Sequence, residues 1–304
     1  MVAQLVKEGI RVTAYDLSKD DSRLRLLLDE AELAKVEKST GDIRDKDAFA
    51  ELVADGQFTH IIHLAGLQVP FCVANPTLGS EVNVTGTVNV LEAVRRNESV
   101  RGLTYASSVA VFGSAEMYEG GVAHDDSALL PATLYGTYKQ ANEGSARVFA
   151  NDWGVGSIGL RPCIVYGPGR DQGLTSDVTK SMLAAAAGQP SHIGFGGSST
   201  FQHAEDMAKT FIESARLEVD DARIFNVPGP TVAISDIASL ISEETGVEVT
   251  VADNELPLPK GVDGEALDQL LVGKSEQRPI EQGVRESIEQ FRRLLTEERL
   301  SPPG

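Results

Sequence analysis

Cysteine is scarce in this chain, and histidine is not arranged to make up for it. The 304 residues include two cysteines and five histidines. Cys72 and Cys163 lie far apart and lack the close spacing of zinc or redox motifs. His60 and His63 are close in sequence, but on a strand they would point to opposite faces and could not share one ion. The chain is therefore not a disulfide scaffold, and we expect no metal site and two reduced cysteines.

Positive charge and long apolar runs are also in short supply. Lysine and arginine number 27 against 45 aspartates and glutamates, which gives a net charge of −18. Such an acidic chain is not suited to nucleic acid or to anionic membrane surfaces, which attract basic patches. No stretch approaches the roughly 20 apolar residues that span a bilayer, and the first nine residues do not resemble a signal peptide. We therefore expect a globular protein of the cytoplasm.

Apolar periodicity predicts strands and helices that alternate along the first half of the chain. Strands are expected at 10–15, 58–64, 102–106 and 157–165, and helices before Gly9 and at 47–53, 78–96 and 135–152. Alternation of this kind implies right-handed crossovers between parallel strands. The fold class is therefore α/β.

Glycine and proline become more frequent after residue 165. Helices are expected at 175–188, 205–217, 235–245 and 284–296, and a late strand at 223–227. This change predicts a first domain at 1–165 and a smaller lobe at 166–304. Residues 203–230 of that lobe are expected to return to the first domain.

The most informative motif is Tyr135-Gly136-Thr137-Tyr138-Lys139, which begins 27 residues after Ser108. On a helix, Tyr135 and Lys139 would share one face. A neighbouring ammonium favours the phenolate, so we expect Lys139 to lower the pKa of Tyr135 from its usual value of about 10. Such a phenol can exchange a proton with a hydroxyl or a carbonyl, while a serine donates a hydrogen bond to the same oxygen.

The spacing alone is weak evidence. Tyr15 and Lys19 repeat it where a strand ends and a polar turn begins. An exposed amphipathic helix explains a single copy equally well. The serine pair at 107–108, which closes an expected strand, gives the Tyr135 copy its context.

These landmarks, in this order, resemble the extended short-chain dehydrogenases, specifically the NAD-dependent epimerase/dehydratase family. The likeness covers nearly the whole chain. It implies a Rossmann-like doubly wound parallel sheet with a smaller C-terminal substrate-binding lobe, and NAD as cofactor. It also implies that Ser108, Tyr135 and Lys139 are catalytic. Family members commonly dimerise through two helices, here 78–96 and 135–152, so a homodimer is expected.

The resemblance also assigns cofactor-binding residues. Asp16 ends a strand where an acid accepts hydrogen bonds from the adenosine ribose and disfavours NADP, although a turn-forming aspartate would look the same. Asn83 would brace the site from the middle helix. The implied set is Asp16, Asp42, Ile43, Leu64, Ala65, Gly66, Asn83, Tyr135, Lys139, Pro162 and Ile164, with the last two beside the nicotinamide ring.

Two departures from the family pattern bear on the substrate. Sugar dehydratases carry an Asp-Glu pair where this chain has Val109 and Ala110, which cannot move a proton. An arginine that often grips the diphosphate of nucleotide sugars has no counterpart at 196–200. The first change disfavours a dehydratase, and the second favours a polyol, a free sugar or a sugar acid. The candidate substrate residues are Gln68, Ser108, Arg170, Gln172 and Thr175, of which Arg170 could equally be a solvated loop arginine.

The family pattern further implies an element that this sequence lacks. Family chains open with a strand and a Gly-x-x-Gly-x-x-Gly turn whose NH groups hold the cofactor pyrophosphate, and roughly 15–20 residues of that pattern are not found here. We expect an open slot in the sheet between the strands at 10–15 and 58–64. A misassigned start or a truncation, a naturally shortened non-catalytic relative, and a partner segment that fills the slot each account for it.

The expected function is that of an NAD-dependent oxidoreductase or epimerase. It would act on a hydroxyl carbon of a sugar, sugar acid or nucleotide sugar, with Tyr135 as acid and base. The alternative is a regulatory or non-catalytic binding protein with a defective cofactor site. The motif residues serve an epimerase and a dehydrogenase equally well, and they do not identify the substrate.

Overall fold

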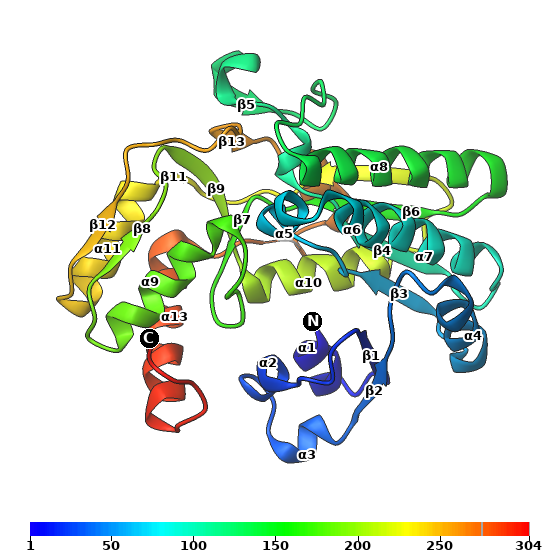
Figure 1. The fold of residues 1–304 in the computed structure, drawn as a ribbon, viewed down its shortest axis with the longest axis horizontal. Helices are drawn as coiled ribbons and strands as arrows, with labels where there is room; N and C mark the ends of the chain where they lie inside the picture. Colours follow the sequence, from blue (N-terminus) through cyan, green and yellow to red (C-terminus); the bar gives the residue numbers. More distant parts are fainter. Residues whose placement is uncertain (275, 304) are drawn as a thin grey trace.

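A four-stranded parallel sheet forms the centre of the molecule. The computed structural model describes residues 1–274 and 276–303 (Figure 1). The strands lie in the order β10 (Ala222–Asn226), β6 (Ser157–Arg161), β4 (Gly102–Ala106) and β3 (His60–His63). The central strands β4 and β6 are buried nearly throughout. Strands covered on both faces in this way read as continuous apolar segments rather than alternating ones, which is why both were predictable.

Helices cover both faces of this sheet (Figure 1). Helix α10 (Ala204–Ala215) packs against β3, β4 and β6 on one face. On the other face lie α4 (Lys46–Gly56), α7 (Gly86–Arg95) and α8 (Leu134–Trp153), with the short helices α5 (Val69–Ala74) and α6 (Pro76–Ser80) beside them. The observed architecture is the Rossmann-like α/β fold that the alternating pattern predicts.

The first 40 residues form a separate layer. They comprise α1 (Val2–Lys7), β1 (Val12–Asp16), α2 (Ser22–Arg25), α3 (Glu30–Leu33) and β2 (Val36–Thr40). Strands β1 and β2 pair in parallel with each other, and among the described residues neither pairs with β3. The interval between these strands is where the sequence predicts an open slot. The side chain of Gln4 donates a hydrogen bond to the carbonyl of Glu205 at 2.8 Å and ties this layer to α10.

The C-terminal lobe is built on short strands and three longer helices. One sheet contains β7 (Ile164–Tyr166), β9 (Ser198–His203) and β11 (Thr231–Ala233), and a second pairs β8 (Ser191–Ile193) with β12 (Val249–Val251). The helices are α9 (Asp177–Ala186), α11 (Ile234–Thr245) and α13 (Ile280–Thr296), and they enclose the largest apolar core cluster. Strands β5 (Val122–Ala123) and β13 (Gly261–Val262) pair near α12 (Glu265–Leu271). The domain boundary at 165 stays a prediction.

Three local features differ from the sequence-based prediction. The strand expected at 157–165 is divided at Pro162, which cannot donate a ladder hydrogen bond, so β6 and β7 belong to different sheets. The helix expected at 78–96 contains a π-helical turn at Glu81–Thr85 between α6 and α7. Strand β2 was not predicted, because only Val36 of its residues is buried and the alternating signal is faint.

The described part of the chain contains no helix that is both long and apolar enough to cross a membrane.

Candidate active site

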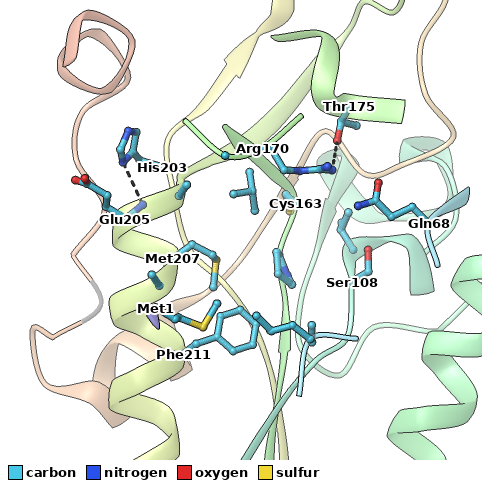
Figure 2. A pocket seen from close by; sticks show the side chains of 18 of the residues that line it. Met1, Gln68, Ser108, Cys163, Arg170, Thr175, His203, Glu205, Met207 and Phe211 are labelled. Carbon is cyan, nitrogen blue, oxygen red and sulfur yellow. Dashed lines mark hydrogen bonds between the residues drawn. The ribbon is translucent and has the colours of Figure 1, made fainter. Parts of the chain in front are cut away.

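A cavity of about 870 Å³ lies at the carboxyl ends of the central strands. The ends of β3, β4 and β6 contribute Leu64, the segment 106–110 and Pro162, and the loop after β7 contributes Arg170 and Thr175. Figure 2 shows polar groups of Ser108, Gln68, Arg170 and Thr175 gathered at one end, with Met1, Met207 and Phe211 at the other. Ligands of open α/β sheets bind at this edge, beyond the carboxyl ends of the strands.

Tyr135, Lys139 and Ser108 meet beside this cavity, as their spacing predicts. The ammonium of Lys139 lies 5.6 Å from the centre of the Tyr135 ring, so the two side chains share one face of α8. The Ser108 hydroxyl lies close enough to the Tyr135 phenol to favour the charged form of the phenol. Lys139 is buried, and its Nζ donates to the carbonyl oxygen of Ala106 at 2.6 Å. A phenol, a hydroxyl and an ammonium are thus held together at the end of β4.

A glycine allows this close arrangement. Gly136 follows Tyr135 on α8, and a Cβ atom there would lie 2.0 Å from the carbonyl oxygen of Ala110. Any larger residue at position 136 would force the backbone of α8 away from the segment that carries Ser108. Thr133 caps the helix, since its hydroxyl accepts a hydrogen bond from the Gly136 NH at 3.1 Å. The first turn of α8 is therefore fixed against the end of β4.

The pKa values of the pair differ from the prediction. Burial raises the pKa of Tyr135 above its usual value, and the groups that oppose this shift are Ser108 and Arg170 rather than Lys139. The expectation that Lys139 lowers the pKa of Tyr135 is therefore wrong for this structure. Burial also lowers the pKa of Lys139 to about 8, which weakens the positive charge that the prediction relied on.

Asn83 braces the loop that follows β3. It lies in the π-helical turn, is buried, and donates through Nδ2 to the carbonyls of Leu67 and Gly79, each at 3.0 Å. Its Oδ1 accepts from the Leu67 NH at 3.1 Å. A Cβ atom at Gly66 would lie 2.7 Å from that same Oδ1, so only glycine fits there. π-Helical turns of this kind are frequent at functional sites.

Several predicted cofactor residues lie outside the cavity. Asp16 is exposed at the end of β1, where its carboxylate accepts from the Ser18 NH at 2.8 Å, as in an ordinary turn. Arg44 holds Asp42 at 2.6 Å and lowers the pKa of that carboxyl. Ile43 is buried in the core, and Ala65 and Gly66 do not line the cavity. Their proposed contacts with the cofactor stay predictions.

Ile164 requires a correction. Its side chain is buried in the apolar core of the C-terminal lobe and does not face the cavity. Pro162 and Cys163 line the cavity instead, because the chain crosses from β6 to β7 at these residues. Alternation along a strand explains the difference, since Ile164 lies on the pleat opposite to that of its neighbours.

The candidate substrate residues separate into two groups. Gln68, Arg170 and Thr175 line the cavity with Ser108, and the Arg170 guanidinium donates to the Thr175 hydroxyl at 3.4 Å. Arg170 is partly buried, and in the described part of the chain it forms no ion pair. Gln172 is exposed and does not line the cavity. No group of three or more metal-ligating side chains occurs among the described residues.

Sequence reasoning missed one buried ion pair behind the site. Glu143 of α8 pairs with Arg161 of β6 at 2.8 Å, and both side chains are only 3% exposed. Arg161 was noted only as part of a motif. The signal that could have found this pair is a glutamate four residues after Lys139, on the helix face that Tyr135 and Lys139 were predicted to share.

Comparison with known proteins identifies the group to which this arrangement belongs. The model of the NAD dependent epimerase/dehydratase family matches residues 1–227. The chain belongs to that family. Because this family depends on NAD, NAD is the cofactor of this protein.

Its similarity to individual relatives is weaker. It is 27% identical over 305 residues to an uncharacterized 37.6 kDa protein of Escherichia coli O111:H-, an alignment that covers 91% of this chain and 88% of the relative. It is 33% identical over 171 residues to UDP-glucuronate 4-epimerase 4 of Arabidopsis thaliana, covering 56% of this chain but 38% of that protein.

Solved structures share the fold. A UDP-glucose 4-epimerase of Thermus thermophilus in complex with NAD has a TM-score of 0.80 and 24% identity, with 96% of this chain and 94% of that chain covered. A monomeric L-threonine 3-dehydrogenase from a metagenome has a TM-score of 0.82 and 17% identity, with 96% and 95% covered. Proteins of different activity therefore share this scaffold.

The residues at the cavity fit the nicotinamide half of NAD. Tyr135 and Lys139 could hold the hydroxyls of the nicotinamide ribose, and Pro162 offers an apolar surface to the ring.

The burial of Lys139 generates a prediction about pH and stability. The folded protein releases the Lys139 proton near pH 8, whereas the unfolded chain keeps it up to its usual pKa of 10.5. The free energy of unfolding of the wild type should therefore rise relative to that of Lys139→Met as the pH increases between these two values, by up to about 3 kcal/mol. Urea unfolding across this range measures the difference. Lys180→Met, at an exposed lysine, should give no such change, and a flat difference for Lys139→Met would contradict a buried ammonium.

Proposed function

We propose that this protein is an NAD-dependent epimerase or dehydrogenase that acts on a hydroxyl carbon of a sugar, sugar acid or nucleotide sugar. The observation that carries the proposal is that Tyr135 and Ser108 line one large cavity close to each other, with Lys139 beside the Tyr135 ring. Family membership supports the same chemistry.

Each side chain has a definite part in this reaction. NAD, held by Tyr135 and Lys139, would supply a reversible hydride acceptor. Tyr135 takes the proton of the substrate hydroxyl as the carbon becomes a carbonyl carbon, and gives it back when the carbonyl is reduced. Ser108 donates a hydrogen bond to the same oxygen and orients it. If the carbonyl is reduced again on the opposite face of the carbon, the product is an epimer. If the carbonyl compound is released instead, the enzyme acts as a dehydrogenase.

Arg170 supports a substrate that carries an anionic group. Its guanidinium lies in the cavity wall near Tyr135 and forms no ion pair within the described ranges, so a carboxylate or phosphate would complete its contacts. The Arabidopsis relatives are named as UDP-glucuronate 4-epimerases, whose substrate contains both groups. The nonpolar Val109 and Ala110 beside Ser108 disfavour a dehydratase, because neither can move a proton.

Replacing the phenol tests the reaction directly. Tyr135→Phe should lower kcat by about 10²–10⁴-fold, because the proton of the substrate hydroxyl then has no acceptor. NADH absorbance and product analysis follow turnover of UDP-glucuronate, UDP-glucose, free glucuronate and simple polyols. Tyr138→Phe is the matched control, since the Tyr138 hydroxyl donates to the Pro76 carbonyl and Tyr138 does not line the cavity. A wild type that binds no dinucleotide would favour the regulatory alternative.

Replacing the cavity arginine tests the substrate class. Arg170→Met should raise KM at least about tenfold for substrates with an anionic group, because a charged hydrogen bond contributes about 1.5–3 kcal/mol. Neutral sugars and polyols should be affected much less. Arg23→Met is the control, since Arg23 lines the same cavity but is already paired with Asp171 at 2.7 Å. Equal effects on charged and neutral substrates would count against an anion-binding role.

We also infer that the protein is a cytoplasmic homodimer. Phe71, Val73, Leu134, Val148 and Trp153 expose apolar side chains on α5 and α8, and such surfaces favour association. Cys72 and Cys163 are free thiols, which suits a reducing compartment. Light scattering should give twice the chain mass, and Val148→Asp with Trp153→Asp should give the monomer mass. A wild type with the mass of one chain would refute the dimer.

A further inference from the structure

A buried polar network lies at the end of β4 and extends from the cavity-lining segment that contains Ser107 and Ser108 into the protein interior. It joins Ser107, Glu143 and Arg161, each no more than 3% exposed. The Ser107 hydroxyl donates to Glu143 Oε1 at 2.5 Å, and Arg161 donates to the same oxygen at 2.8 Å and to Oε2 at 2.9 Å. Arg161 also donates to the carbonyl of Asp125 at 2.9 Å.

A network of this kind is not explained by stability alone. Two charges lose their hydration on burial, and well-packed apolar residues often serve a fold equally well. Here the carboxylate is engaged through both oxygens, and the guanidinium lies 4.9 Å from the centre of the Phe112 ring. The network also connects three elements of the site: the end of β4, the helix α8 and strand β6.

Ser107 connects this network to Ser108, because the two residues are adjacent and the backbone around them is held by hydrogen bonds. The Ser107 NH donates to the Leu160 carbonyl at 2.7 Å, and the Val109 NH donates to the Pro162 carbonyl at 2.9 Å. These two bonds fix the backbone on either side of Ser108. Adjacent residues in extended backbone point to opposite sides, so the Ser107 hydroxyl reaches Glu143 while the Ser108 side chain lines the cavity.

Glu143 is also coupled to the tyrosine side of the site. It lies four residues after Lys139 and eight after Tyr135 on α8, so all three share one helix face. One carboxylate thus holds the serine segment against the same helix that carries the phenol. We therefore expect a movement of Ser107 away from α8 to increase the distance between the Ser108 hydroxyl and the Tyr135 phenol.

We propose that Glu143, held by Arg161, is a positioning residue that fixes Ser108 in hydrogen-bonding reach of Tyr135 through the hydroxyl of Ser107. This rests on the proposed function in one respect only, namely that the Ser108–Tyr135 pair is the reacting pair. The geometry of the pair can be measured whether or not a substrate is found.

Ser107→Ala is the primary test. It removes the hydroxyl and leaves the Glu143–Arg161 ion pair intact, whereas removing Glu143 leaves a buried guanidinium unpaired. A displacement of about 1 Å at a reacting group can cost about 10²-fold, so kcat should fall by roughly 10- to 100-fold. KM and the affinity for NAD should remain within about twofold, because the Ser107 hydroxyl that is removed is buried and bonded to Glu143 rather than exposed to a ligand in the cavity. Ser107→Thr keeps the hydroxyl and should restore kcat.

Glu143→Gln adds a second measurement, the pH profile of kcat, which should not change if Glu143 has only a structural role. The carboxylate of Glu143 raises the pKa of Lys139 against the effect of burial. Its neutralisation should therefore shift the alkaline limb of the kcat profile to lower pH. Asn142→Ala is the matched control, since Asn142 is equally buried on α8 and its amide atoms have no hydrogen-bond partner among the described residues. It should leave both kcat and the profile unchanged.

A measurement without substrate separates this proposal from the proposed function. Tyrosine labelled with ¹³C at Cζ gives a resonance for Tyr135, identified by its loss in Tyr135→Phe. That resonance should shift in Ser107→Ala and Glu143→Gln, and not in Asn142→Ala. If the wild type turns over no sugar and the resonance still shifts, only the proposed function fails. If folded Ser107→Ala and Glu143→Gln leave the resonance in place, the positioning role is overturned, whatever the activity.

Discussion

The close approach of α8 to the end of β4 is the constraint on which the site depends. The backbone of Gly136 passes so near to Ala110 that a single added carbon would collide with its carbonyl oxygen. This contact brings the Tyr135 phenol and the Ser108 hydroxyl together, although they lie 27 residues apart in the sequence. The helix is fixed there by its Thr133 cap at one end and by the Glu143–Arg161 ion pair two turns further on.

Burial, rather than charge attraction, sets the acid–base character of the site. Desolvation is the largest influence on both Tyr135 and Lys139, and it favours the neutral form of each. The lysine in turn donates to the carbonyl of Ala106, so its main contact is with the backbone beneath the site. The phenol depends on Ser108 and Arg170 for stabilisation of its charged form. A substrate oxygen that enters between Tyr135 and Ser108 therefore meets groups that are partly buried and already positioned by the fold.

The sequence predicted the elements whose signals are local. Strand β4 has the predicted bounds, and α8 begins and ends within one residue of the prediction, because burial on both faces and a capping threonine leave clear patterns. The sequence-based prediction failed where contacts with distant segments of the chain decide the structure. Pro162 divides a continuous apolar run between two sheets, and the Ile164 side chain lies in the core of the C-terminal lobe, whereas the family resemblance implied a place beside the nicotinamide ring. Strand β2 depends on pairing with β1 and has almost no apolar pattern of its own.

By itself the sequence determined the α/β alternation and the shared helix face of Tyr135 and Lys139, since spacing along regular elements fixes which side chains lie together. The place of Ser108 beside this pair was implied by the family resemblance. Only the tertiary structure showed that the pKa of Tyr135 is raised rather than lowered and that Arg170 lines the cavity. It also revealed the contact of Glu143 with Ser107 next to the site. These depend on desolvation and on contacts between distant segments, which no local pattern encodes.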